Sequence, residues 1–296
     1  MEQICRDDEW IVDESSLTTV SFLGRGNFGC VVSLEEDSNS KLWAKKSSPM
    51  HLKNILDKEL RIMHRFRDHP RIVNASTTMN LQTKRYECYT IYTEYASQGN
   101  LNELIYGSPR RSQPIPESLV QRAARMILEG LVALHSHGYV HCNLKPSNVF
   151  VFPSTTTGEP WDLKLAGFGS SKEPDSEYDS MSFGTAAKYL PPESFAPNEV
   201  IIHPDLDIYA LGCVVYEMFG AIPIPEPFDE FYEWILRGRD ISSEARDFLR
   251  LCRDIHPSRP TAADLLNHPF ITRRLELPTT EEDKEISSSL LPSELF

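Results

Sequence analysis

The chain has 296 residues, of which 40% are hydrophobic and 25% are charged, so it is long enough for one large domain or two coupled lobes with a proper core. Its formal net charge is −13, which argues against nucleic acid or an anionic membrane as the main partner, because both demand a basic surface. The longest apolar run, residues 208–219, includes Glu217 and is too short to span a bilayer, so no membrane insertion is expected.

The cysteines predict neither a disulfide framework nor a zinc site. Six of them are scattered along the chain without a CxxC pair, and no histidine cluster sits at metal-ligand spacing. Free thiols in a reducing compartment are the better interpretation. The acidic N-terminus lacks the apolar core of a secretory signal. We expect a soluble intracellular protein, located in the cytoplasm, with the nucleus as a second compartment.

The first ninety or so residues are predicted to be mainly strands. Residues 20–34 are rich in β-branched and apolar side chains interrupted by glycines, and a turn at 37–40 separates them from a second strand that begins at Lys41. Residues 51–65 have apolar side chains at helical spacing. Residues 88–94 are again typical of a strand.

From Pro116 onward the apolar period becomes that of a helix, which Gly138 is expected to follow. Further helices are predicted within residues 208–219 and 242–252. We therefore predict an α+β fold with a β-rich lobe at about 15–95 and a helical lobe at about 97–273. An N-terminal extension at 1–14 precedes this 15–273 domain, and an acidic flexible tail at 274–296 follows it.

A glycine-rich segment, Gly24-Arg-Gly-Asn-Phe-Gly-Cys-Val31, lies between two predicted strands. The same glycine spacing also opens dinucleotide-binding domains, but those require a helix directly after the glycines. Two flanking strands instead favour a hairpin over phosphates, where the backbone can approach closely because glycine has no Cβ. Lys46 follows on the next strand, and Glu59 on the next helix is its natural partner. A solvated basic edge and one more solvated helix charge are the alternatives for these two residues.

The segment His141-Cys-Asn-Leu-Lys-Pro-Ser-Asn-Val149 resembles the catalytic loop of protein kinases, H-R-D-L-K-P-x-N. Leu165-Ala-Gly-Phe-Gly169 stands where such kinases have D-F-G, and residues 189–193 resemble the A-P-E end of an activation segment. Asp207 to Gly212 resembles the helix that anchors the lower lobe, and Arg259 is where the family keeps an arginine that pairs with the Glu193 position. The order and spacing of these motifs match the family from about Thr18 to Phe270.

The resemblance implies a bilobal Ser/Thr-type protein kinase fold. Cys142 in the catalytic loop and the phrases Ser258-Arg-Pro-Thr-Ala262 and Asn267-His-Pro-Phe270 are similar to plant MAP kinase kinase kinases. The implied nucleotide contacts are Leu23, Gly24, Gly26, Gly29, Val31, Ala44, Lys46, Glu59, the hinge residues Thr93, Glu94 and Ala96, and Phe150. Lys145 and Asn148 match catalytic-loop contacts, and Met63, His141 and Phe168 match an internal spine.

Two positions depart from the family pattern in ways that affect the chemistry. Asn143 replaces the aspartate that accepts the substrate proton, and an amide has no basic lone pair at neutral pH. Gly167 replaces the aspartate that binds magnesium, which leaves Asn148 as the only remaining metal ligand of the family pattern, so no metal site is predicted. Each loss alone predicts a severe reduction in rate, since a positioned base contributes about 10² to 10⁴.

Few other carboxylates could take over the roles of the two missing aspartates. Asp162 begins the strand that leads to Gly167, but strand alternation predicts that it lies far from the phosphates. Glu173 and Asp175 follow in the activation segment. Cys142 in place of arginine removes the clamp for phosphates on Ser176, Ser180 or Ser182, although active plant relatives also carry cysteine there.

The predicted function is therefore a pseudokinase that binds ATP weakly and with little dependence on magnesium. Its predicted role is that of a scaffold or allosteric partner, bound to a kinase or a kinase substrate, in a MAP kinase-type pathway. The alternative is a low-activity serine/threonine kinase that uses ATP and magnesium, with Lys145 as the Ser/Thr-type residue. A relic without a role is a third interpretation.

Overall fold

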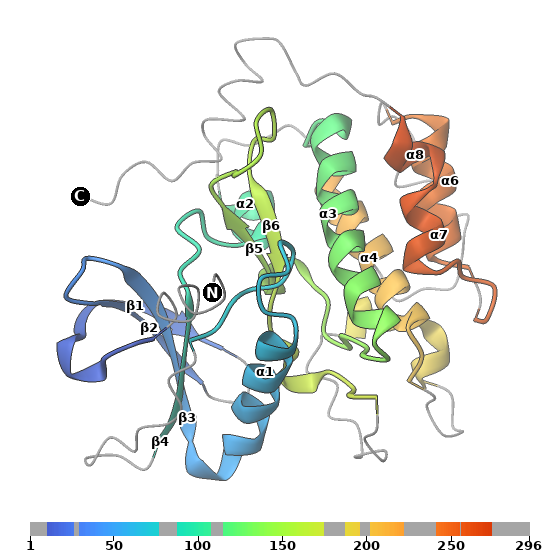
Figure 1. Cartoon of the computed structure of the whole chain (residues 1–296). Coiled ribbons are helices and arrows are strands. Elements are labelled where there is room, and N and C mark those ends of the chain that lie inside the picture. The colour runs from blue at the N-terminus through green and yellow to red at the C-terminus, as the bar shows by residue number, and fades with distance from the viewer. Residues whose placement is uncertain are drawn as a thin grey trace, which may run out of the picture. The chain divides into compact units, whose positions relative to one another are not determined.

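The computed structural model describes residues 11–26, 30–76, 88–107, 115–174, 187–195, 202–221, 241–254 and 256–273. The chain forms two compact units (Figure 1). Unit 1 comprises Met1–Ser97 with Gly167–Gly169, and unit 2 comprises Gln98–Ala166 with Ser170–Phe296. Strands dominate the first unit and helices the second, which confirms the predicted α+β class.

Unit 1 contains a four-stranded antiparallel sheet in the order β1-β2-β3-β4. The strands are β1 (Thr18–Arg25), β2 (Val31–Glu36), β3 (Leu42–Pro49) and β4 (Cys88–Glu94). The run predicted at 20–34 is thus two strands of a hairpin. The turn that follows is held by Asp37, whose carboxylate accepts the backbone N–H groups of Asn39 and Lys41 at 2.8 and 3.0 Å. This side-chain acceptor is what aspartate typically supplies in a tight turn.

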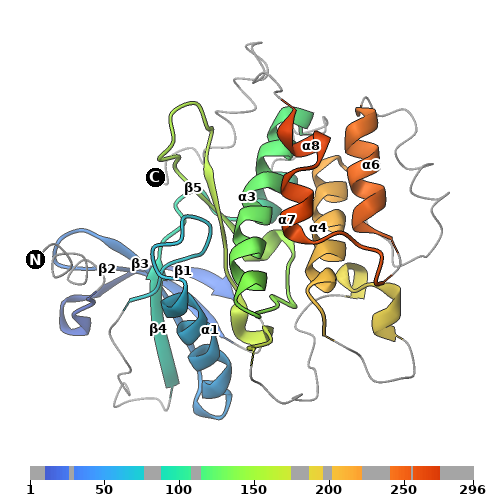
Figure 2. The ribbon, with the colours of Figure 1, turned by 45° about the vertical axis from the view of Figure 1, so that its right-hand side comes forward.

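The helix of unit 1, α1 (Lys53–Arg65), packs against β3 and β4 and follows a short 3-10 turn at Met50–Leu52. Figure 2 shows the α1 ribbon beside β4. The apolar face of α1 buries Leu56, Leu60 and Met63, as the helical spacing predicted. A separate buried cluster joins Val12 to Trp43 and Tyr92. It ties the segment that contains the 3-10 turn Glu14–Ser16 to the sheet.

Unit 2 has α3 (Glu117–Ser136) at its centre, packed against β6, α4, α7 and α8. The other described helices and strands of unit 2 are α2 (Leu101–Tyr106), β5 (Val149–Phe152), β6 (Asp162–Leu165), α4 (Asp205–Met218), α6 (Ser243–Cys252), α7 (Ala262–Leu266) and α8 (Pro269–Thr272). Single 3-10 turns lie at Pro146–Asn148, Ala187–Tyr189 and Pro192–Phe195, and another, Phe168–Ser170, runs from unit 1 into unit 2. The strands β5 and β6 form an antiparallel hairpin.

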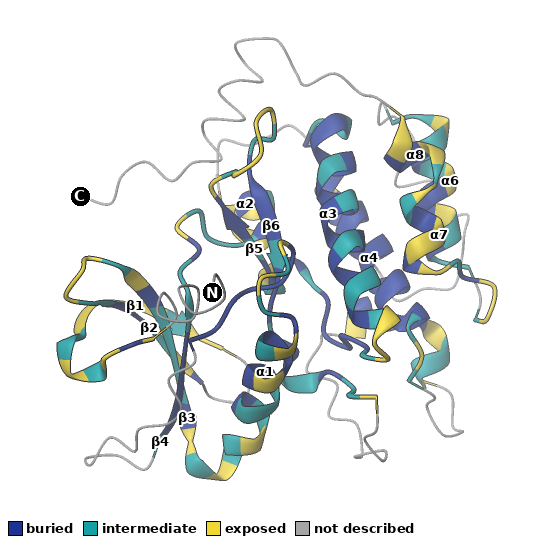
Figure 3. Ribbon diagram, in the orientation of Figure 1, coloured by how far each residue is buried: buried dark blue, intermediate teal, exposed yellow. Residues whose placement is uncertain are grey.

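Every residue of α4 is buried, including Asp205, Asp207 and Glu217 (Figure 3). A helix without a solvent face must satisfy its charged side chains internally, because an unpaired buried charge is costly. The carboxylates of α4 therefore mark places where other segments of unit 2 are attached to it.

The five cysteines in the described part of the chain are free thiols. Burial raises the pKa of Cys213 to about 12 and also raises those of Cys252 and Cys30, so these thiols stay protonated and unreactive at neutral pH. Among the described helices, none is long and apolar enough to cross a membrane.

Candidate functional site

The predicted ion pair of the nucleotide site is present in unit 1. The Nζ atom of Lys46 lies 2.6 Å from Oε2 of Glu59, and the Glu59 side chain is almost completely buried. The pair joins β3 to α1, and alternation along β3 places Ala44 on the same sheet face as Lys46. A solvated helix charge is therefore the wrong interpretation for Glu59, because its carboxylate holds the Lys46 ammonium in one position.

The glycine-rich hairpin lies between β1 and β2, as predicted, and not before a helix. The N–H of Gly26 donates to the Cys30 carbonyl at 2.9 Å and closes the hairpin. A Cβ placed on Gly26 would lie 4.0 Å from Cε of Lys46, so this turn and the lysine are neighbours within unit 1. Leu23 and Val31 are exposed at the hairpin ends. Gly29 lies outside the described residues.

The predicted hinge segment begins in β4, where Thr93 pairs with Ala44. The next residue, Glu94, is held through its backbone and its side chain. Its N–H donates to the Asn74 carbonyl at 3.0 Å, and its carboxylate accepts the Asn74 N–H at 2.7 Å. Ala96 is buried. These contacts hold the hinge backbone in one conformation, and nucleotide contacts there stay a prediction.

The position of the missing metal ligand, Gly167, has φ +80°, a region that glycine enters without strain and that aspartate tolerates better than most residues. Gly169, two residues later, packs closely on α1 within unit 1. A Cβ there would lie 2.5 Å from Cγ2 of Ile55. The glycine spacing around Phe168, which is fully buried, therefore serves close packing as well as backbone freedom.

We expect Gly169→Ala to lower the free energy of unfolding by about 1–3 kcal/mol, because overpacking forces α1 or the 167–169 segment to shift. Ile55→Ala removes the clashing methyl group. Combined with Gly169→Ala, it should cost less than the sum of the two single changes, as a double-mutant cycle in urea unfolding would measure. Additive costs would contradict the close contact.

The catalytic-loop segment of unit 2 is fastened to α4 by Asp207. One carboxylate oxygen accepts the His141 N–H at 2.8 Å and the other accepts the Cys142 N–H at 2.9 Å, while His135 Nε2 lies 2.8 Å from the first. Cys142 has φ +56°, so these two hydrogen bonds hold a backbone conformation that a non-glycine residue rarely adopts. Sequence reasoning had assigned Asp207 to the anchoring helix but had not identified this role or that of His135.

The tautomer of His141 follows from its partners. The ring is fully buried; Nδ1 accepts the Asn143 N–H at 3.2 Å, and Nε2 lies 3.0 Å from the Ala166 carbonyl oxygen. Because a carbonyl can only accept, Nε2 carries the proton. His141 thereby links the catalytic loop to the residue that precedes Gly167.

Hydrogen bonds hold the polar residues of the catalytic loop, where an amide stands at the position of the family's base. Nδ2 of Asn148 donates to the Asn143 carbonyl at 2.7 Å, and the Ala166 N–H donates to the Asn148 carbonyl at 2.9 Å. Asn143 itself is buried. Partial burial lowers the pKa of the Lys145 ammonium, because desolvation disfavours the charged form.

The residues present do not fit a magnesium ion. Asp162 is the only carboxylate within residues 141–152 and 161–172, and its Oδ2 atom accepts both the N–H and the hydroxyl of Thr155 at 2.8 Å. It therefore closes the β5–β6 hairpin. That Asp162 lies far from the phosphates stays a prediction from strand alternation, and its contact with Thr155 agrees with that prediction. Magnesium prefers carboxylates and phosphates as ligands, whereas the other side-chain oxygens of this segment belong to neutral asparagine and serine residues. Glu173 lies just beyond this segment, and Asp175 lies outside the described residues.

Glu217, at the other end of α4, fastens the residues that precede the A-P-E position. Its buried carboxylate accepts the hydroxyls of Tyr106 and Tyr189 at 2.6 Å and pairs with Lys188 at 2.9 Å. The predicted pairing of Arg259 with Glu193 is confirmed, with both guanidinium nitrogens on the carboxylate at 2.5 and 3.1 Å. Residues 175–186, which include the proposed phosphate acceptors, lie outside the described residues.

Comparison with known protein families shows to which family the chain belongs. Residues 17–271 match the model of the protein kinase domain. The chain belongs to the protein kinase family. The match covers both units and includes every motif described above, so the predicted fold and Ser/Thr-type resemblance are confirmed. Members of this family bind ATP, usually with magnesium.

The kinase domain is similar to MAP kinase kinase kinases of Arabidopsis thaliana. Mitogen-activated protein kinase kinase kinase 3 is 30% identical over 285 residues, which cover 89% of this chain and 44% of that protein. Mitogen-activated protein kinase kinase kinase 5 is 30% identical over 90% of this chain and 38% of that protein. Mitogen-activated protein kinase kinase kinase 20 is 28% identical over 97% of this chain and 87% of that protein. The chain thus spans less than half the length of the first two relatives.

Proposed function

We propose that this kinase-like chain is a pseudokinase that binds ATP weakly, with little dependence on magnesium, and acts as a scaffold or allosteric partner in a MAP kinase-type pathway. The observation that supports this most directly is that the two acidic positions are lost while their surroundings are kept. Lys46 and Glu59 form their ion pair at 2.6 Å, and Asp207 holds the loop around Asn143. A chain drifting without function would not be expected to keep these costly buried polar contacts.

The charge balance explains the proposed loss of magnesium dependence. A working kinase offsets the nucleotide–metal complex with two carboxylates, whereas Asn143 and Gly167 carry no charge. Removing two negative charges makes the positions near the phosphates more favourable to metal-free ATP, since like charges repel. Lys46 and Lys145 remain as cations.

Thermal unfolding of the purified chain with ATP tests this proposal. We expect millimolar ATP to raise Tm equally in magnesium and in EDTA, because a ligand that binds only the folded state stabilises it by mass action. Lys46→Met should weaken binding about tenfold or more, since it removes the charge that would contact the phosphates. Lys45→Met, on the neighbouring residue of the opposite sheet face, is the matched control. Absence of binding in calorimetry at millimolar ATP with EDTA would refute it.

A low-activity serine/threonine kinase is the second candidate, because Lys145 and Asn148 keep their family positions and Glu173 lies close in sequence. A radiolabel transfer assay separates the two functions. Transfer that Lys46→Met abolishes would support the enzyme and would make Glu173→Gln the next variant. Stabilisation by ATP without transfer would support the pseudokinase.

The proposed partner is a kinase or a kinase substrate of the same pathway type. The resemblance to MAP kinase kinase kinases supports this choice, and the net charge of −13 is compatible with a basic partner surface. The test is the phosphorylation rate of a MAP kinase kinase by an active relative with increasing amounts of this chain. A saturable change in rate is expected, and a rate independent of the chain would contradict the proposed role.

A further inference from the structure

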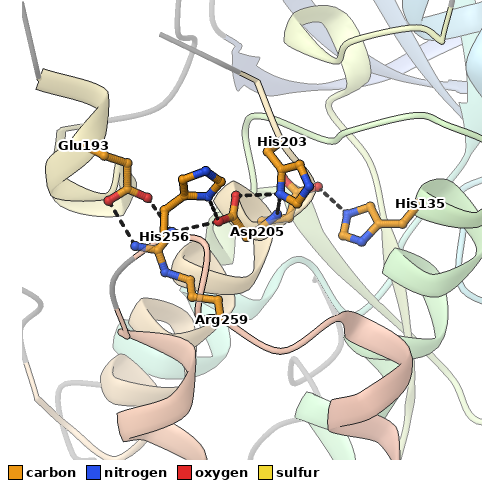
Figure 4. A network of polar contacts seen from close by, with 7 residues as sticks. His135, Glu193, His203, Asp205, His256 and Arg259 are labelled. Atoms are coloured by element: carbon orange, nitrogen blue, oxygen red, sulfur yellow. Dashed lines mark hydrogen bonds and ion pairs between the residues drawn. The ribbon is translucent and has the colours of Figure 1, made fainter.

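We propose a transition-metal site of the zinc class in unit 2, formed by His203, Asp205 and His256. The three side chains come from the segment before α4, the first residue of α4 and the loop after α6. One nitrogen or oxygen atom from each lies within 4.8 Å of the others. Figure 4 shows both imidazole rings directed at the Asp205 carboxylate.

The contact distances are close to those of a coordination shell. Nδ1 of His203 lies 3.1 Å from Oδ1 of Asp205, and Nδ1 of His256 lies 2.5 Å from Oδ2. Zinc–ligand bonds of about 2.0–2.2 Å imply neighbouring tetrahedral ligands about 3.3 Å apart. The first distance is close to this value, and the second is shorter by less than about 1 Å. The two contacts are made by different oxygens of Asp205, and the ligand atoms of the three residues lie within 4.8 Å of one another, so metal binding requires a small rearrangement of the side chains.

Nδ1 of His203 is available to a metal ion at little cost. It lies 3.1 Å from Oδ1 of Asp205 and 3.5 Å from the backbone nitrogen of Asp205. An unprotonated Nδ1 has one lone pair, which can either accept this backbone N–H or bind a metal ion. The contact with the N–H is long for a hydrogen bond, so exchanging it for a metal bond gives up little.

The Asp205 carboxylate also lies near the guanidinium group of Arg259. Nη1 of Arg259 lies 3.6 Å from Oδ2 of Asp205, and the same guanidinium pairs with Glu193. Such outer partners orient the ligands of metal sites. Two carboxylates face this one guanidinium, so the cluster is negative when both histidines are neutral. Asp205 is 7% exposed and His203 55% exposed, which gives a fixed ligand and an entry path.

The ligand types select the metal. Two imidazoles and one carboxylate suit zinc, copper or nickel, whereas magnesium and calcium prefer oxygen ligands alone. Three protein ligands leave a fourth position for water or for a side chain of another molecule. The site uses none of the residues predicted to contact nucleotide or to take part in catalysis, and it does not depend on the proposed pseudokinase function.

Calorimetric titration of the EDTA-treated full chain with Zn²⁺ tests the proposal. We expect one site with a Kd in the micromolar range or below, and at least a tenfold weaker Kd in His203→Ala/His256→Ala. The control His51→Ala/His137→Ala removes two exposed histidines elsewhere and should bind zinc like the natural sequence. Mg²⁺ should give no binding at this site.

Cobalt provides an independent readout, because Co²⁺ in a tetrahedral nitrogen–oxygen site absorbs in the visible range and zinc displaces it. The absorption should be lost in the first double variant and kept in the control. Circular dichroism of each variant separates ligand loss from unfolding. Equal zinc affinity in both double variants, or no binding by the natural sequence, would overturn the proposal.

Discussion

Restoring both acidic positions in one chain, with Asn143→Asp and Gly167→Asp, is expected to create magnesium-dependent phosphate transfer at least about 10²-fold above the natural sequence. A positioned base contributes about 10² to 10⁴, and metal stabilisation of phosphoryl transfer contributes several kcal/mol. The surroundings favour the gain, because the Lys46–Glu59 pair and the Asp207 contacts are already in place.

The backbone at Gly167 allows this restoration at a modest cost. Its φ of +80° is strained for most residues, but aspartate tolerates this region at a cost of about 1 kcal/mol. Each single change should give far less activity than the pair, because both groups serve one transition state. The measurement is radiolabel transfer from ATP with and without magnesium, and Lys46→Met in the restored chain is the control for contaminating kinases.

Equal transfer by the natural sequence and by the restored chain would contradict the assignment of Asn143 and Gly167 as inactivating. It would also favour the low-activity kinase. Magnesium-dependent ATP binding in the restored chain without transfer would instead show that the metal position is regained and that the base is not sufficient.

Asp207→Ala is expected to lower the free energy of unfolding by about 3–5 kcal/mol. The carboxylate is almost fully buried and accepts two backbone N–H groups and the His135 ring contact. Its removal leaves those donors buried without an acceptor, at about 1–3 kcal/mol for each group. The loop that contains Asn143 also loses the contacts that hold Cys142 at positive φ.

The midpoint of urea unfolding measures this loss, and two variants provide controls. Asp207→Asn keeps one acceptor oxygen and should cost less than the alanine change. Asp247→Ala removes a half-exposed carboxylate that pairs with Arg250 and His268, and exposed pairs contribute only about 0–1 kcal/mol. A similar midpoint for Asp207→Ala and Asp247→Ala would show that the α4 contacts do not carry the expected energy.

Several elements were predictable because their signals are local. The helical spacing at residues 51–65 corresponds to α1, and the period from Pro116 to Gly138 corresponds to α3, with Pro116 and His137 at its ends. The strand at residues 88–94 is β4. The glycine-rich hairpin was distinguished from a dinucleotide fold by its flanking strands, which is again information from neighbouring residues.

The motifs also predicted contacts between residues that lie at fixed positions of the family. Lys46 and Glu59 are thirteen residues apart, yet the strand-then-helix order predicted their contact, and the contact is present at 2.6 Å. The pairing of Arg259 with Glu193 was implied by the resemblance to protein kinases and is confirmed. The loss of the two catalytic aspartates is a fact of the sequence, because it concerns which side chains exist and not where they lie.

Only the tertiary structure decided which buried polar groups meet. Nothing in the local sequence indicates that His135 and Asp207 share a hydrogen bond across 72 residues, or that His203, Asp205 and His256 converge when the last two are 51 residues apart. Such clusters form where separate segments pack on α4, and a buried carboxylate takes whatever donors the packing brings within reach. The sequence shows which side chains are present and how they repeat, whereas the packing of other segments on α4 decides which of them meet.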